Sequence, residues 1–263
     1  MVIVEKLKAR KDEPKRYVCF MKCETTGVFR GAPVTKVDIV RAEHKDLFEG
    51  VERRTWLFNP GVPVADEALR AGGLTREEVE NAPVMTESHI KEIIDFTDDA
   101  DIVAWHPSFD ISHLLDTFLS KGVKHNFLSV NTISEREAAR KRMGDVEKYT
   151  FADALAKTGV GGKTDADGVY RLWLDLGDFY CEPTNALFEK FSTGLTVDGF
   201  VGVRQGMLCF RTGKHQGELI HNQPDYCKWL VQKSDMSLDT KRLVAAYLKE
   251  YEKDIEEHCN YAK

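Results

Sequence analysis

The stretch Val18-Cys-Phe-Met-Lys-Cys-Glu-Thr-Thr-Gly27 guides the interpretation of this 263-residue chain. It begins as an apolar run and ends in charged and small polar residues. We interpret Tyr17–Met21 as a buried strand, because a short apolar run with polar flanks is typical of one. Side chains alternate between the faces of a strand, so Lys22 and Glu24 share one face and Cys23 lies on the other. The stretch predicts a buried strand ending beside a lysine and a glutamate.

Two later segments also combine an apolar element with an acidic residue. Ile102-Val-Ala-Trp-His-Pro-Ser-Phe-Asp110 is an apolar strand and a short turn that lead to Phe-Asp at the start of a helix. Tyr149-Thr-Phe-Ala-Asp-Ala-Leu-Ala-Lys-Thr-Gly159 predicts a helix. Gly162-Lys-Thr-Asp-Ala-Asp-Gly-Val-Tyr-Arg-Leu-Trp-Leu174 places Asp167 before an apolar helix. The chain thus presents an acid near three separate apolar elements.

In their order and separation, these segments resemble the three motifs of the DEDD (DnaQ-like) 3′–5′ exonucleases. The first motif of that family is an apolar strand ending in Asp-x-Glu-Thr-Thr-Gly. The resemblance implies that Glu24, Asp110 and Asp167 correspond to metal-binding acids. It also implies Mg²⁺ or Mn²⁺ as the cofactor of an active member, because such hard cations take carboxylate oxygens.

The chain departs from the family at two catalytic positions. Lys22 stands where the metal-bridging aspartate is expected, and Gly162 stands at the general-base histidine. The tyrosine of the other family branch is replaced by Lys163. A cation at position 22 opposes divalent ions, and one unit interaction at about 4 Å is worth roughly 4 kcal/mol at an effective dielectric near 20. The departures predict a pseudoenzyme in which Lys22 neutralises Glu24 and Asp167.

No neighbour repairs the motif. Asp165 is two residues from Asp167, and positions two apart on a helix point to different sides. His106 replaces the general base only if it reaches across the cleft.

The resemblance also implies a substrate cleft beside the first two motifs. Small residues and free amides after the first strand allow a 3′ terminus to approach, and an aromatic ring can stack on a base. The residues expected to contact substrate are Thr25, Thr26, Gly27, Val28, Phe29, Trp105, His106 and Phe109.

The remaining patterns predict an α/β fold class, a mixed sheet flanked by helices. The family resemblance implies that this sheet is ribonuclease-H-like. The expected strands after the first are Val34–Val40, Arg53–Phe58, Asp101–Ala104 and Phe127–Thr132. Helices are expected to begin at a capping box on Thr75, near Pro83 and Thr86, after Asp110, and at Ser134.

A boundary near Gly177–Thr193 suggests an exonuclease domain over residues 1–180 and a small module over 194–263. Leu208-Cys-Phe-Arg-Thr-Gly-Lys-His-Gln-Gly217, followed by Pro224-Asp-Tyr-Cys-Lys-Trp-Leu230, is similar to the C-terminal module of exonuclease X-type proteins. The module is expected to hold Trp229 in its core and a turn at Gly213–Gly217. Its role is open between holding a phosphate, through Lys214 and His215, and a purely structural one.

Composition is that of an ordinary globular protein, with 42% hydrophobic and 30% charged residues. The net charge of −6 argues against a protein that coats nucleic acid non-specifically, but leaves room for a nuclease with a local basic groove. No apolar run reaches the ~20 residues of a membrane helix. The N-terminus reads as a short strand, and the scattered cysteines predict reduced thiols in a cytoplasmic protein.

Three functions remain open. The favoured one is an impaired exonuclease that binds the 3′ end of single-stranded nucleic acid, with no membrane partner. The others are an active metal-dependent 3′–5′ exonuclease on DNA or RNA, and a protein-interaction module on an inactive nuclease scaffold. A protein partner and a homodimer are compatible with the sequence.

Overall fold

The computed structural model describes residues 5, 14–125, 131–144, 148–182 and 184–261. The described chain divides into two compact units. The first contains Lys15–His125 and Thr132–Ser192, and the second contains the residues from Thr193 onward. The strand expected at the N-terminus lies outside the described residues apart from Glu5.

The first unit is built on a sheet of five described strands in the order β3-β2-β1-β4-β5. β1 (Tyr17–Thr25), β2 (Val34–Glu43) and β3 (Glu52–Leu57) form an antiparallel meander. β4 (Ala100–Ala104) and β5 (Thr132–Ser134) run parallel to β1. The predicted mixed α/β fold class is confirmed, with the predicted Tyr17–Met21 strand at its centre.

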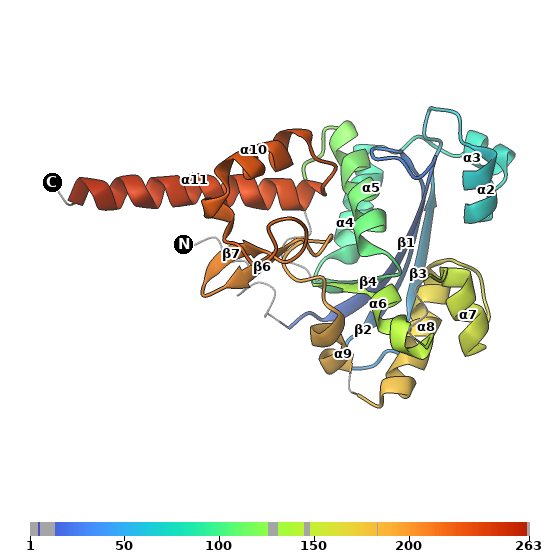
Figure 1. Ribbon diagram of the computed structural model, residues 1–263. Coiled ribbons are helices and arrows are strands. Elements are labelled where there is room, and N and C mark those ends of the chain that lie inside the picture. Colours follow the sequence, from blue (N-terminus) through green and yellow to red (C-terminus); the bar gives the residue numbers. More distant parts are fainter. Residues whose placement is uncertain (1–4, 6–13, 126–130, 145–147, 183, 262–263) are drawn as a thin grey trace. The chain divides into compact units, whose positions relative to one another are not determined.

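Helices cover both faces of this sheet (Figure 1). α4 (Glu87–Thr97) and α5 (Pro107–Ser120) lie on one side. α6 (Glu135–Arg142), α7 (Phe151–Thr158) and α8 (Ala166–Tyr180) lie on the other. Both faces of β1 are therefore covered, which explains why its first half reads as a continuous apolar run.

The alternation of side chains between the two faces of β1 places Lys22 and Glu24 on the same face. Val18 and Phe20 are fully buried in the core that includes α8. Lys22 and Glu24 follow on the same face but remain partly accessible. Cys23 is fully buried on the opposite face. The charged residues thus begin where the apolar core on the α8 side ends.

Local capping signals explain where several helices begin. Thr75 and Thr86 each form a capping box, at α3 (Arg76–Asn81) and at α4. Asp165 caps α8, accepting from the Gly168 amide at 3.0 Å. These side chains satisfy amides that a helix start leaves without an intrahelical acceptor.

Three local features differ from the expectations. α2 (Asp66–Gly72) was not expected, because Ala65 before it gives no side-chain cap. α9 (Thr184–Phe191) lies within the expected boundary region and belongs to the first unit. β5 starts at Thr132, and residues 126–130 of the expected final strand lie outside the described residues.

The second unit combines a hairpin with helices. β6 (Val201–Arg204) pairs with β7 (Met207–Phe210). η1 (Ile220–Asn222), α10 (Pro224–Lys233) and α11 (Leu238–Tyr261) follow. The hairpin and helices share one apolar core. None of the helices in the described part of the chain has the length and hydropathy required to span a bilayer.

Trp229 does not lie in the core of this unit, contrary to expectation. It is 47% exposed, and its ring stacks on Tyr226 at a centroid distance of 5.5 Å. Cys227 and Leu230 from the same helix are fully buried instead. The residues of each pair, Tyr226 with Trp229 and Cys227 with Leu230, are three positions apart. Either pair therefore has the spacing of a buried helix face, and the tertiary packing of α10 determines which one is buried.

Glu135 is the first residue of α6 and is fully buried. Neither of its carboxylate oxygens has a hydrogen-bond partner in the part of the chain that the structure describes. Burial raises the pKa of Glu135 well above its ordinary value of 4.5, because an unpaired charge is poorly solvated inside a protein. The folded chain therefore retains a proton here that the unfolded chain releases.

We expect this proton to make stability depend on pH. A raised carboxyl pKa stabilises the folded state fully below 4.5, and the effect is lost as the pH rises toward the folded-state pKa. Within that window each pH unit lowers the free energy of unfolding by about 1.4 kcal/mol. Glu135→Gln should remove this slope and stabilise the protein at neutral pH, as measured by urea unfolding between pH 4.5 and 8. Exposed Glu137→Gln is the control, and an unchanged slope in Glu135→Gln would contradict the assignment.

Candidate functional site

The end of β1 projects beyond its parallel neighbour. Pairing with β4 stops at Met21 and Ala104, two residues before Cys23. The Cys23 amide instead donates to Asp110 Oδ1 at 2.8 Å. Asp110 lies in the first turn of α5, which begins soon after β4, and its side chain is 2% exposed. A backbone hydrogen bond thus fixes the second-motif acid beside the first motif.

Lys22 lies between the carboxylates of Glu24 and Asp110. Its Nζ is 3.1 Å from Glu24 Oε1 and 3.7 Å from Asp110 Oδ1. The same ammonium donates to the Cys23 carbonyl at 2.8 Å. The side chains of Lys22 and Glu24 are 17% and 14% exposed, so water screens the cluster weakly. One ammonium therefore contacts both acids that the first two motifs were expected to contribute.

The electrostatics favour a protonated Lys22. Burial acts to lower its pKa, but the negative charges of Asp110 and Glu24 outweigh burial, and the pKa of Lys22 is raised. Burial raises the pKa of Glu24, and the Lys22 ammonium opposes that effect. Each carboxylate thus depends on Lys22 for compensation of its charge.

Gly72, at the end of α2, confines Glu24 from one side. A Cβ added at Gly72 would lie 3.0 Å from Glu24 Cγ, tighter than most contacts of real Cβ atoms. The glycine allows the helix end to pack against the glutamate.

The Asp167 carboxylate forms ion pairs with two arginines. Its Oδ2 is 2.6 Å from Arg171 Nε, and its Oδ1 is 3.0 Å from Arg53 Nη2. Arg171 is one helical turn further along α8, whereas Arg53 comes from β3. The structure brings Lys22, Glu24 and Asp110 together. Lys22 was expected to pair with Glu24 and Asp167, but its second carboxylate partner is Asp110, and Asp167 is paired with the two arginines.

Asp38 and Lys36 on β2 were not anticipated from the sequence. In the strand register Lys22 lies opposite Asp38, and Glu24 lies opposite Lys36. Asp38 lies 3.4 Å from Lys36 and accepts hydrogen bonds from Thr55 and from the Ala166 amide. Opposite charges directly across a strand pair attract each other. Only knowledge of the register between β1 and β2 would have revealed these pairs.

Every acid around the site has a base within ion-pair distance. The acids are Glu24, Asp38, Asp110 and Asp167, and the bases are Lys22, Lys36, Arg53 and Arg171. Two divalent ions need a surplus of anionic oxygens around them. Among the described residues, His, Cys, Asp and Glu side chains form no group of three that suits a metal ion. These residues, in this arrangement, do not fit the metal pair that the motif resemblance implies.

The general-base position is also unsuited to a histidine. Gly162 has φ +110°, a conformation that L side chains rarely adopt. A histidine there would be strained unless the backbone changed. His106 is exposed, and its Nδ1 caps α5 by accepting from the Phe109 amide at 3.3 Å. A helix cap is therefore the role that the structure gives His106.

The segment after β1 supplies the exposed side chains of the expected substrate cleft. Thr25 and Thr26 are buried, whereas Val28 and Phe29 are 89% and 62% exposed. A Cβ added at Gly27 would lie 3.0 Å from the Phe29 ring. Gly27 thus lets the Phe29 ring fold back over the backbone while keeping much of its surface accessible.

Trp105 is not placed to stack on a base, which corrects the expectation from its position in the second motif. It is 9% exposed, and its ring is stacked on Phe151 at a centroid distance of 5.0 Å. Phe109 is half-buried and lies 4.3 Å from the His113 ring. His113 contacts the carbonyl oxygens of Phe109 and Phe29 through its two ring nitrogens. His113 therefore links the start of α5 to the exposed segment.

Comparison with known proteins identifies the fold. No family model matches the chain, and no curated protein matches it by sequence. A 3′-exonuclease whose structure shows 3′-end specific recognition of a histone mRNA stem-loop is 14% identical, with a TM-score of 0.52 over 79% of this chain and 96% of that one. A full-length 3′-exonuclease is 15% identical, with a TM-score of 0.52 over 78% and 94% of the two chains.

The nuclease domain of 3′hExo, a DEDDh family member bound to rAMP, is also similar. It is 16% identical, with a TM-score of 0.51 over 65% of this chain and 96% of that domain. At these identities the likeness establishes the fold alone. The chain has the DnaQ-like 3′-exonuclease fold, as the ordered motifs predicted.

We expect Lys22→Asp to convert the cluster into a metal site, because it replaces the ammonium with a third carboxylate. When Mn²⁺ is present at about 100 times its Kd, binding should stabilise this variant by about 2.7 kcal/mol. Wild type should show no such stabilisation. Thermal unfolding with Mn²⁺ or with a chelator measures the difference. Lys22→Met removes the cation without adding a ligand and is the matched control. A Mn²⁺-dependent shift in wild type equal to that of Lys22→Asp would refute the replacement of metal by Lys22.

Proposed function

We propose that this chain binds the 3′ end of single-stranded nucleic acid through an exonuclease fold whose metal centre is replaced by a lysine. The proposal rests on the position of Lys22 Nζ, which lies 3.1 Å from Glu24 Oε1 and 3.7 Å from Asp110 Oδ1. An ammonium tethered to the backbone is present at all times, whereas a divalent ion must displace it without a bridging ligand. We therefore expect little or no hydrolysis.

The exposed groups support a binding role. Phe29 offers an accessible ring beside the end of β1, and stacking on such a ring is tolerant of base identity. Arg53 and Arg171 are 53% and 50% exposed and contribute positive charge near the third motif. In this proposal a terminal base stacks on Phe29 and the arginines attract the adjacent phosphates. Two of the similar structures are described with a 3′-end RNA and with rAMP, which is consistent with this placement.

Catalysis would require groups that this site does not present together. Phosphodiester cleavage by two metal ions needs one ion to activate water and another to stabilise the leaving oxygen. Here Lys22 holds Glu24 and Asp110, and arginines hold Asp167. The residues present can position an anionic strand, but supply no surplus anionic charge for Mg²⁺ or Mn²⁺.

We expect wild-type protein to bind 3′-ended single strands without cleaving them in Mg²⁺ or Mn²⁺. Affinity should fall as salt rises, because phosphate contacts release counterions. Phe29→Ala should weaken binding by about 1–3 kcal/mol, the usual contribution of one stacked base. Fluorescence anisotropy and gel analysis of the same end-labelled strand measure binding and cleavage. Phe48→Ala is the control, because Phe48 is 75% exposed on the turn between β2 and β3.

Two other results of the same experiment would favour the alternative functions. Robust Mg²⁺-dependent cleavage that Asp110→Ala abolishes would establish an active exonuclease and overturn the proposal. Absence of both binding and cleavage would favour a protein-interaction module on the same fold.

A further inference from the structure

The second unit carries a ladder of aromatic rings that leads from its core to its surface. Phe210 is fully buried and meets Tyr226 at a centroid distance of 5.4 Å. Tyr226 in turn stacks on Trp229 at 5.5 Å with an interplanar angle of 26°. Trp229 is 47% exposed, and His215 lies 4.5 Å from the Tyr226 ring. The outer end of the ladder is a large aromatic surface that the core does not use.

The structure holds this surface in place. α10 is anchored by the fully buried Cys227 and Leu230, which lie beside Tyr226 and Trp229 in sequence. The turn that carries His215 is closed by a hydrogen bond from the Gly217 amide to the Phe210 carbonyl at 2.8 Å. A stacking surface that is already ordered loses little side-chain entropy when a ligand binds.

The charge around the ladder favours an anionic partner. Residues 204–233 contain five basic residues and two acidic ones, in a chain whose net charge is −6. The basic residues are Arg204, Arg211, Lys214, Lys228 and Lys233, and the acidic ones are Glu218 and Asp225. The segment is therefore positive within an otherwise acidic protein.

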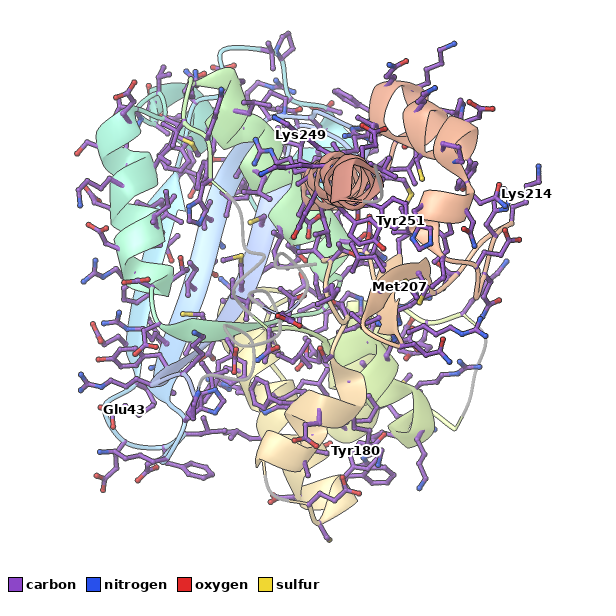
Figure 2. The ribbon with its side chains drawn as sticks, turned by 90° about the vertical axis from the view of Figure 1, so that its left-hand side faces the viewer. Glu43, Tyr180, Met207, Lys214, Lys249 and Tyr251 are labelled. Carbon is purple, nitrogen blue, oxygen red and sulfur yellow. The ribbon has the colours of Figure 1, made fainter. Side chains whose placement is uncertain are left out.

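The lysines nearest the aromatic residues in sequence are accessible. Lys214 lies on the outside of its unit (Figure 2). Lys228 is 71% exposed and lies 3.7 Å from Asp225, which is 97% exposed. Such an exposed pair contributes little and leaves Lys228 able to contact a phosphate. Glu218 is engaged with His215 and Gln223.

We infer that the second unit binds the interior of a single nucleic-acid strand, with a base stacked on Trp229 and phosphates contacting Lys214 and Lys228. Exposed aromatic rings combined with cations match bases joined by phosphates. A neutral apolar partner would gain nothing from the cations. This site needs no strand end, so it is independent of the proposed 3′-end site in the first unit.

A closed circular single-stranded oligonucleotide tests this inference, because it has no 3′ end. Wild-type full-length protein should bind the circle in fluorescence anisotropy. Trp229→Ala should lower the affinity about 5- to 150-fold, and Trp229→Phe should retain most of it. Lys214→Ala and Lys228→Ala should each weaken binding and reduce the salt dependence by about one phosphate contact. Phe48→Ala should leave binding of the circle unchanged.

Two results would overturn the inference. One is failure of wild-type protein to bind the circle. The other is equal affinity of wild type and Trp229→Ala, with equal thermal unfolding temperatures to show that the variant is folded. If 3′-ended strands bind only through Phe29, the proposed 3′-end function survives while this second site fails. If circles bind and end-specific binding is absent, the second site survives alone.

Discussion

A partly buried ammonium between two carboxylates organises the end of the central strand. β1 continues past its last pair with β4, so its final residues have no partner on that strand. Asp110 accepts a hydrogen bond from the Cys23 amide instead. That arrangement buries a carboxylate beside Glu24. Two buried negative charges at such proximity would be costly without a cation. Lys22 supplies the cation, so the local geometry of β1, α5 and Glu24 depends on this one side chain.

The same balance extends outward from the strand. Lys36 faces Asp38 on β2, and Arg53 and Arg171 hold Asp167 on α8. Each partner reduces the negative charge that a pair of divalent ions would require. The loop at Gly162 adds a steric argument, because its positive φ disfavours a histidine at the general-base position. Electrostatics and backbone conformation thus both support our proposal that the chain holds a strand without cutting it.

The sequence predicted what depends on local patterns. The period of two put Lys22 and Glu24 on one face of β1, and capping boxes marked the helices after Thr75 and Thr86. It could not predict contacts that depend on distant segments. Arg53 and Asp167 are separated by 114 positions, and the burial of Trp105 depends on Phe151 from α7.

Crystallography with Mn²⁺ tests the central claim most directly. Crystals of the wild-type protein soaked in Mn²⁺ would reveal a bound ion by its anomalous scattering. The account predicts that Lys22 Nζ lies between Glu24 and Asp110 and that no anomalous peak occurs there. A Mn²⁺ peak within about 2.0–2.6 Å of oxygens from both carboxylates, with the Lys22 side chain displaced, would contradict it.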